Sequence, residues 1–473
     1  MFNKKYLIII IFIIFLLKLY FSYSFPVITG DWAYYNTIAN NILSGCGVSL
    51  STEGEICAKH FGGNQGPGYP FFISIIYFVF GKNTFNIIII QNLILALSQF
   101  YLLSHLEKKF ISKKFFIFSI FVICLSPLVF AWSRFMLTEP ITIAITYLLI
   151  AYMMNPKRNI FFIGLILSLG TYIRLDFILM SSLIFYLIAV ESKNKTIIAK
   201  KILQLTLIIG LAWTPWLTRN YYAEINIFPS EYPQKANFYN PKGFVKWTST
   251  WVFNSYQRAG TVNQIMSGIY SEIDIGDKYY FDDEIEKKKI NKLLDNLKKY
   301  DHKSFPRELD EKFNKIAKEK IKNNMINYYF YLPSKRLANI IFNFTNSHGW
   351  PIEFSSYFSQ EDRIIISEFN ILDKAKFAIQ NFNQKIFYKI VLNSYKILIF
   401  FLFFILILTK HRPSISSLHL SIALYFMVKL VFMITFNHTE IRYLITCFAL
   451  LDIPILLKLE GFFINKNKKI FNT

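Results

Sequence analysis

The sequence has few charged residues for its length: they make up 17% of 473 residues, against about a quarter in soluble domains. Glycine (18), proline (15) and cysteine (4) are also scarce, which excludes a collagen-like chain, a disordered chain and a disulfide-framework protein. Aromatic residues are abundant instead, with 50 Phe and 29 Tyr, more than a compact water-soluble core buries. The composition therefore indicates a membrane protein.

Apolar segments recur along the chain, and a helix that spans a bilayer needs roughly 20 apolar residues. The first runs from Tyr6 to Leu17, and no small-residue cleavage site follows it, so we interpret it as an uncleaved span. Nine further spans are predicted at about 84–105, 114–133, 139–154, 159–175, 177–190, 199–216, 390–409, 413–436 and 443–459. The sequence thus predicts an α-helical polytopic membrane protein with about ten transmembrane helices.

Basic residues support this topology, because Lys and Arg gather in cytoplasmic connections. They precede the first span, lie in every second connection, at 108–114, 157–158, 193–201 and 410–412, and recur in the tail at 458–469. Both termini are therefore predicted to be cytoplasmic. Since topology explains most of the formal charge of +22, we expect no nucleic-acid partner.

Two segments on the outer side are longer than turns. Residues 24–83 form a long first periplasmic loop, with an amphipathic helix expected at 32–43 and a short apolar piece at 71–80. Residues 217–389, between spans seven and eight, are polar, with charge-rich helical stretches at 282–300 and 306–325. The predicted organisation is a transmembrane module (1–216), a periplasmic mixed α segment (217–389) and a second transmembrane module (390–473).

Cysteine usage fits this layout. Cys46 and Cys57 lie in the first outer loop, which would meet an oxidising compartment, so they are candidates for a disulfide. Without nearby His pairs, their spacing is poor evidence for zinc. Cys124 and Cys447 lie inside spans, where a thiol behaves as a small apolar group.

Acids and arginines converge at the predicted outer ends of the spans. Charges at a membrane boundary either snorkel or line a polar cavity. The convergence therefore suggests a cavity for an anionic, partly lipidic ligand. The residues are Asp31, Glu139, Asp176, Glu440, Arg134, Arg174, Arg219 and Arg442.

All of these residues except Arg134 also have a purely structural interpretation. Asp31 could cap the 32–43 helix, and Thr138-Glu139-Pro140 is a good helix start. Arg174 and Asp176 are two residues apart, do not share a helical face, and could both be interfacial anchors. Structural roles are likewise open for Arg219 (the end of an aromatic belt), for His438, Glu440 and Arg442 (a polar turn), and for His60 (a loop residue).

A series of short motifs resembles, in order, the membrane glycosyltransferases of the GT-C fold, in the branch of the protein O-mannosyltransferases and aminoarabinose transferases. No single motif is specific, but the ordered series is. The motifs are 30–35 (GDWAYY), 39–45, 66–70 (GPGYP), 91–93 (QNL), 133–139 (SRFMLTE), 170–174 (GTYIR), 215–220 (PWLTRN) and 440–443 (EIRY).

The resemblance implies an enzyme that moves a sugar from a polyprenyl-phosphate-linked donor to a cell-envelope acceptor on the outer side of the membrane. A composition rich in Ile, Phe, Asn and Lys is typical of an AT-rich bacterial genome, so we expect a bacterial inner membrane with the outer parts in the periplasm. Asp31 matches the catalytic base and Glu139 a second acid. A divalent metal between these two acids is possible, but some relatives manage without one. Residues matched to donor and phosphate binding are Arg174, Arg219, Arg442, Tyr443 and Tyr69, and further candidates are Tyr35, His60, Asp176, His438 and Glu440.

Two departures from the family pattern stand out. Trp32 follows Asp31 where protein mannosyltransferases often have a second acid, which weakens a protein-mannosylation interpretation. Gln65-Gly66 stands where relatives often have a basic residue, and Lys59 or His60 could substitute.

Two other classes remain open: a polyprenyl-lipid flippase or transporter, and a non-catalytic envelope-assembly protein. Transporters tend to have internal repeats and ionisable groups near the membrane midplane. This sequence has no visible repeat, and most intramembrane charge lies near span ends. Lys429, inside a span, is the exception, and its ammonium is expected to snorkel outward.

Overall fold

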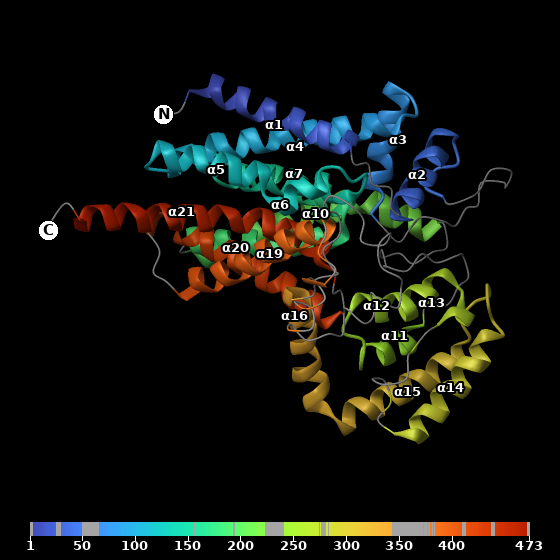
Figure 1. Ribbon diagram of the computed structural model, residues 1–473. Coiled ribbons are helices and arrows are strands. Elements are labelled where there is room, and N and C mark those ends of the chain that lie inside the picture. Colours follow the sequence, from blue (N-terminus) through green and yellow to red (C-terminus); the bar gives the residue numbers. More distant parts are fainter. Residues whose placement is uncertain are drawn as a thin grey trace.

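The structure is a computed structural model that describes residues 3–24, 30–49, 66–155, 157–192, 194–222, 241–273, 275, 281, 283–342, 372, 376, 379–380, 382, 384–408, 413–436 and 440–470. Two parts are visible: a bundle of long helices, and a smaller group of helices beside one end of it (Figure 1). We call this group, residues 241–323, the outer domain. The neighbouring end of the bundle is the domain end.

The bundle helices match the predicted spans. They are α1 (Lys4–Ser24), α4 (Thr84–Leu106), α5 (Lys113–Leu125), α6 (Pro127–Trp132), α7 (Thr138–Met153), α8 (Ile160–Ile173), α9 (Ser181–Glu191), α10 (Lys195–Tyr222), α19 (Gln384–Leu408), α20 (Pro413–Thr435) and α21 (Ile445–Ile470). The predicted span 114–133 is divided into α5 and α6 at Ser126, because Pro127 cannot donate the next helical hydrogen bond.

Among the described residues, five helices are long and apolar enough to cross a membrane: Lys4–Ser24, Thr84–Lys109, Lys113–Trp132, Lys195–Tyr222 and Ser417–Thr435. Four shorter apolar helices accompany them, Gly68–Phe80, Thr138–Met153, Ile160–Ile173 and Ile390–Ile405. The chain is a multi-pass membrane protein, while the count of ten spans stays a prediction.

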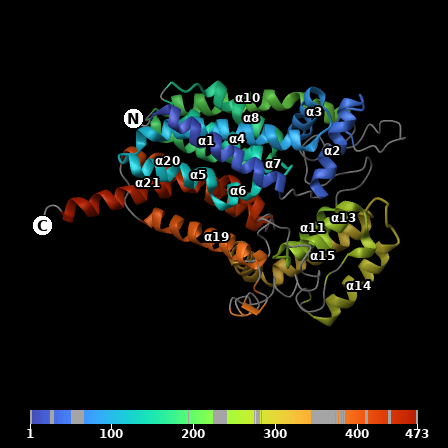
Figure 2. The same ribbon diagram turned by 45° about the horizontal axis from the view of Figure 1, so that its top comes forward.

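Helix α7 is the centre of the bundle, and every residue of it except Leu148 and Tyr152 is buried. It packs against α4, α8 and α21, whereas α10 packs mainly on α8 and turns most of its length outward. Both ribbon views place the start of α1 and the end of α21 at the end of the bundle opposite the outer domain (Figures 1 and 2).

At the domain end, two helices of the first loop cover the bundle. Helix α2 (Gly30–Leu43) contains the predicted amphipathic stretch, and α3 (Gly68–Phe80) the short apolar piece. A Cβ on Gly68 would lie 2.8 Å from the carbonyl carbon of Tyr172, and one on Gly66 would lie 2.1 Å from its oxygen. Glycine therefore lets the start of α3 pack directly on the end of α8.

The outer domain has a hydrophobic core of its own, separate from that of the bundle, with Phe244, Trp247, Leu297 and Phe313 at its centre. Its helices are α11 (Lys242–Thr248), α12 (Ser255–Arg258), η3 (Ala259–Asn263), α13 (Gln264–Ser267), η4 (Tyr270–Glu272), α14 (Glu284–Lys298) and α15 (Arg307–Asn323). The charge-rich stretches predicted at 282–300 and 306–325 are α14 and α15. The predicted domain boundaries themselves stay a prediction.

Candidate active site

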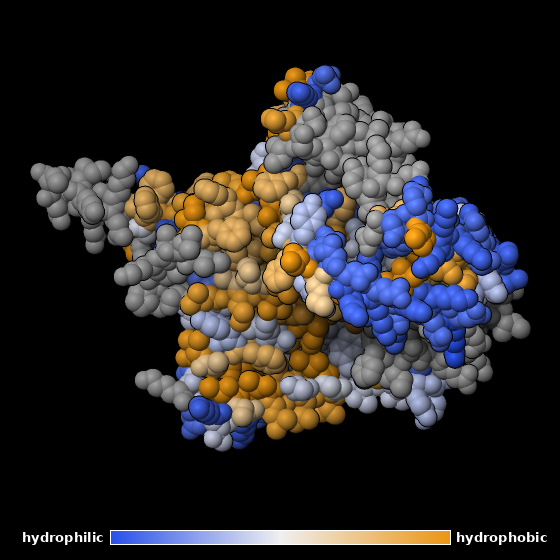
Figure 3. Space-filling model, turned by 90° about the horizontal axis from the view of Figure 1, so that it is seen from below, coloured by the Kyte–Doolittle hydropathy of each residue, from blue (hydrophilic) through white to orange (hydrophobic). Residues whose placement is uncertain are grey.

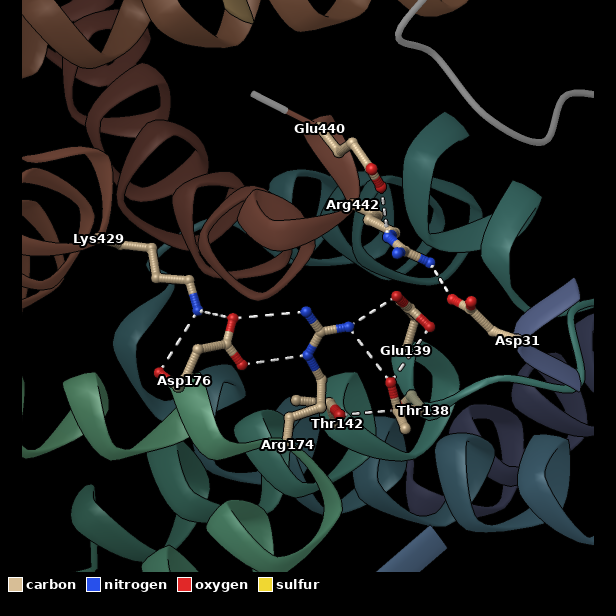
Figure 4. A network of polar contacts seen from close by, with 9 residues as sticks. All are labelled: Asp31, Thr138, Glu139, Thr142, Arg174, Asp176, Lys429, Glu440 and Arg442. Carbon is tan, nitrogen blue, oxygen red and sulfur yellow. Dashed lines mark hydrogen bonds and ion pairs between the residues drawn. The ribbon is translucent and has the colours of Figure 1, made fainter. Parts of the chain in front are cut away.

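The centre of the polar cluster at the domain end is an ion pair between Glu139 and Arg174 (Figure 4). Glu139 lies in the first turn of α7, and Arg174 follows α8 in extended backbone. The Nη1 of Arg174 donates to Oε1 of Glu139 at 2.6 Å and to the Thr138 hydroxyl at 3.2 Å. Only 2% of the Glu139 side chain is exposed. The Thr138 hydroxyl accepts a hydrogen bond from Arg174 of this pair. Thr138 does not cap the helix, because the N-cap residue is Leu137.

Asp176 and Lys429 extend this pair into a row of alternating charges. Nε of Arg174 donates to Oδ1 of Asp176 at 3.2 Å, and Nζ of Lys429 donates to Oδ2 at 2.6 Å. Arg174 and Asp176 can pair although they are two residues apart, because Arg174 is extended and Asp176 begins a 3-10 helix, η2 (Leu175–Met180). The expectation that Lys429 snorkels outward is wrong: 2% of its side chain is exposed, and it contacts Asp176.

A second cluster lies beside this row and is more open. Nη1 of Arg442 donates to Oδ2 of Asp31 at 2.5 Å, and its Nε lies 2.6 Å from Oε2 of Glu440. Burial disfavours the charge on Arg442, but Glu440 and Asp31 outweigh it and hold the pKa of the guanidinium above its ordinary value. The Asp31 side chain is 43% exposed. Asp31 lies in the first turn of α2, which begins at Gly30, so it is not the cap residue.

Tyr443 joins the two clusters. Its ring centroid lies 5.1 Å from the guanidinium carbon of Arg174 and 5.4 Å from that of Arg442, both within cation–π range. Tyr35 is buried near both clusters, and its ring meets that of Tyr69 edge-on at 5.1 Å. The candidate residues from the first loop and from the C-terminal motif therefore do meet in space.

Two side chains of α4 hold the segment that precedes Glu139. Gln91 donates to the carbonyl of Phe135 at 2.6 Å, and Asn92 donates to that of Ser133 at 2.8 Å. The hydroxyl of Tyr69 in turn donates to Oε1 of Gln91 at 3.3 Å. The Gln91-Asn92 and Tyr69 motifs thus position the start of α7, where Glu139 lies.

Arg219 lies outside this network. Among the described residues its guanidinium donates to Oδ1 of Asn220 at 3.0 Å and to the carbonyl of Val48 at 2.7 Å, just beyond α2. It also stacks on Trp216, with 4.9 Å between the guanidinium carbon and the ring centroid. These contacts tie α10 to the first loop.

Other predicted residues fall partly outside the description. His60, His438 and Cys57 are not among the described residues. Cys46 is disulfide-bonded, and Cys124 and Cys447 are free and buried. The pairing of Cys46 with Cys57 stays a prediction.

Sequence reasoning missed Lys429 as a site residue. The signal was present, because a lysine within an apolar helix is costly unless an acid compensates it. Asp176, at the end of another predicted span, is the acid that could have been predicted to pair with Lys429.

The residues do not fit a divalent metal between Asp31 and Glu139. Each of these carboxylates already has an arginine nitrogen within 2.6 Å, so a metal ion would have to displace an arginine from each of them. No group of three or more His, Cys, Asp or Glu in the described part of the chain is arranged to hold a metal.

The two clusters differ in what they can do. In the inner row, Lys429, Asp176, Arg174 and Glu139 neutralise one another, and none of their side chains is more than 13% exposed. In the outer cluster, 43% of the Asp31 side chain and 22% of the Arg442 side chain are exposed, and a guanidinium that exchanges a carboxylate for a phosphate can bind it through two hydrogen bonds. A ligand can therefore compete for Asp31 and Arg442 without first breaking a buried network.

One stretch of the chain matches a known family model. Searches of curated proteins and of solved structures each found no match. Residues 64–218, about a third of the chain, match the family model described as dolichyl-phosphate-mannose-protein mannosyltransferase. The stretch includes Tyr69, Glu139 and Arg174 but neither Asp31 nor Arg442. The match confirms the resemblance predicted from the motifs and supports a membrane glycosyltransferase of the GT-C type.

Proposed function

We propose that the protein transfers a sugar from a polyprenyl-phosphate-linked donor to a hydroxyl or amine of a cell-envelope acceptor. Asp31 is the general base, and Arg442 binds the phosphate of the donor. The observation that carries the proposal is the accessible Asp31–Arg442 pair above a buried, internally neutralised row of charges.

The pair supplies the two functions that such a transfer needs. A hydroxyl or amine is a weak nucleophile, so a carboxylate must accept its proton as it attacks the anomeric carbon. The bond between that carbon and the phosphate oxygen breaks, and the lipid phosphate leaves with the electron pair. Arg442 stabilises the charge on the phosphate through charge-assisted hydrogen bonds. Direct displacement inverts the anomeric carbon.

The inner row has a positioning role in this proposal. Glu139 and Arg174 are engaged with each other, and Arg174 also stacks on Tyr443, the residue next to Arg442. Glu139 therefore acts through Arg174 and Tyr443 to keep Arg442 in place. Arg174 and Arg219 remain candidates for secondary contacts to the donor.

We further propose that the domain end faces the periplasm of a bacterial inner membrane and that both termini are cytoplasmic. The basic connections support this orientation. Lys4 and Lys5 start α1, and Lys108, Lys109 and Lys113 join α4 to α5 at the end opposite the outer domain.

The test is the Asp31→Asn variant in a transfer assay with a purified polyprenyl-phosphate sugar. Asparagine keeps the size of the side chain but removes its basicity, so turnover should fall by about 10²- to 10⁴-fold while the protein still folds. Binding of the donor lipid should persist, which separates an enzyme from a scaffold.

Glu308→Gln is the matched control. Glu308 is an exposed acid of the outer domain that, within the part of the chain that the structure describes, pairs with Lys312 on the same helix, and its removal should leave turnover unchanged. Turnover of Asp31→Asn close to that of the wild type would reject Asp31 as the base without challenging the fold.

A further inference from the structure

The end of the outer domain continues into a helical stretch whose exposed side is uncharged. It comprises η5 (Asn327–Tyr331) and α16 (Leu332–Phe342). Exposed positions at 326, 330, 334, 338 and 342 recur every four residues and so lie on one side. We call the exposed residues of 325–342 the aromatic face: Met325, Ile326, Tyr329, Phe330, Tyr331, Ser334, Ala338 and Phe342.

The preceding helix shows how different this face is. Every exposed residue of α15 except Asn323 is charged: Arg307, Glu308, Glu311, Lys312, Lys315, Lys318, Glu319 and Lys322. In the aromatic face, by contrast, Ile326 is 75% exposed and Phe330 is 70% exposed. The charged side of α15 is an ordinary solvent-exposed surface. A contiguous apolar surface such as the aromatic face marks an interaction site.

The contacts of α16 fix where this face lies. Ile340 is buried in the hydrophobic core of the bundle, with Leu337 and Ile341 packed against it. Nη1 of Arg336 donates at 2.9 Å to the carbonyl of Ile434, next to the last residue of α20. The helix is therefore anchored at the level where a candidate span ends, which is the boundary of the membrane.

The orientation of α16 fits the same boundary. Figure 1 shows it running crosswise to the bundle helices, as a helix parallel to the membrane plane would. Seen from below, the apolar surface of the bundle gives way to the hydrophilic surface of the outer domain (Figure 3). Because α16 packs on the core of the bundle through Ile340, the aromatic face lies beside the bundle and not on the far side of the outer domain.

We propose that the aromatic face lies in the lipid, at the boundary between headgroups and acyl chains of the leaflet on the domain side. Tyr and Phe prefer this depth, and Met and Ile add apolar area. Lys335 and Arg336 are not on the exposed face. The helix is an interfacial anchor that holds the outer domain against the membrane, and this role is independent of the proposed glycosyl transfer.

The experiment places a polarity-sensitive fluorophore on single introduced cysteines in the full-length protein. Ile326→Cys and Phe330→Cys probe two positions of the face. Ile285→Cys is the matched control, an apolar residue 65% exposed on α14 of the outer domain. The unsubstituted chain sets the labelling background, since Cys124 and Cys447 are buried and Cys46 is disulfide-bonded.

Quenching is measured in vesicles of phosphatidylcholine and phosphatidylglycerol, at a protein density that leaves most copies alone. Lipids spin-labelled near the headgroup should quench the labels at 326 and 330 several-fold more than the label at 285, and aqueous iodide should show the reverse order. Equal iodide quenching at all three positions would place the face in water and overturn the proposal. Protection from both quenchers at 326 and 330 would also overturn it, because protein would then cover the face.

Discussion

At the scale of single residues, Asp31 and Glu139 are two acids of one site with opposite surroundings. Glu139 is buried and neutralised by Arg174, whereas Asp31 is half exposed and shares Arg442 with Glu440. The sequence could name both acids and place them near the same membrane boundary. It could not say which arginine each would meet, because Glu139 and Arg174 are 35 positions apart and Asp31 and Arg442 are 411 positions apart.

Arg442→Ala should weaken use of the lipid-phosphate donor. A charge-assisted contact is worth about 1.5–3 kcal/mol, so the KM for the donor should rise by about 10- to 100-fold. Steady-state kinetics with a polyprenyl-phosphate sugar measures this. Glu440→Gln is the control, since it keeps the guanidinium and should change the KM much less. A wild-type KM in Arg442→Ala would move the phosphate contact to another cation, with Arg219 the next candidate.

Lys429 and Asp176 should depend on each other for stability. Removing one partner of a buried pair leaves the other charge uncompensated and costs about 3–5 kcal/mol. Lys429→Met should therefore lower the thermal unfolding midpoint of the purified protein in detergent. The double variant Lys429→Met/Asp176→Asn should be less destabilised than Lys429→Met alone, because the Arg174–Glu139 pair stays neutral.

The double variant distinguishes coupling from packing. The stability lost in the double variant is compared with the losses in Lys429→Met and in Asp176→Asn, each made alone. If the double loss equals the sum of the two single losses, the ion pair contributes nothing and Lys429 matters only as a packed side chain. Lys312→Met/Glu308→Gln, which removes an exposed pair of the outer domain, is the control and should change stability by less than about 1 kcal/mol.

At the scale of elements, the positions of the helices were predictable and their neighbours were not. Apolar runs bounded by basic residues and turns located α4, α7, α8 and α20 to within a few residues. Periodicity is a local property, so it carries over to local structure. That α9 packs on α20, more than 200 residues away, depends on how faces fit one another, and no pattern within either helix shows it.

Gly68→Ala should separate two elements that position the site. The added Cβ would meet the backbone of Tyr172 at 2.8–2.9 Å, and backbone cannot turn aside as a flexible side chain can. Overpacking of this kind costs about 1–3 kcal/mol. Because Arg174 follows Tyr172 by two residues, transfer activity should fall together with the unfolding midpoint.

Gly210→Ala is the matched control for this change. Gly210 lies within α10, and a Cβ there meets nothing within 4 Å. The substitution should leave activity unchanged and should raise stability by up to about 1 kcal/mol, because alanine favours a helix more than glycine does. If Gly68→Ala and Gly210→Ala change activity and the unfolding midpoint equally, the close contact between α3 and α8 is not needed to position the site.

At the scale of the whole molecule, α16 connects the outer domain to the bundle, each of which has a hydrophobic core of its own. One core lies in the bundle and the other in the outer domain, and Ile340 of α16 belongs to the first. The composition predicted the bundle, and the polar stretch predicted a separate outer part. How the two parts attach was not predictable, since the joint depends on the backbone carbonyls that one arginine reaches.

That arginine is Arg336, and its replacement should loosen the outer domain from the bundle. Its guanidinium is buried and donates to the carbonyls of Val252 at 2.9 Å, Ser249 at 2.7 Å and Ile434 at 2.9 Å. Two of these acceptors belong to the outer domain and one to α20, so a single side chain connects both parts. Arg336→Met fills similar space but removes the donor that these three carbonyls share, and a buried group left unsatisfied costs about 1–3 kcal/mol.

Hydrogen exchange of the full-length protein in detergent tests this joint. In Arg336→Met, amides at 249–253 and at the end of α20 should exchange faster, while amides of α15 around Phe313, deep in the outer core, should keep their protection. Lys312→Met, an exposed change on α15, should alter neither group. Unchanged exchange at 249–253 would show that apolar contacts alone hold the outer domain. Faster exchange throughout α15 would show that Arg336 stabilises the outer domain itself and not its attachment.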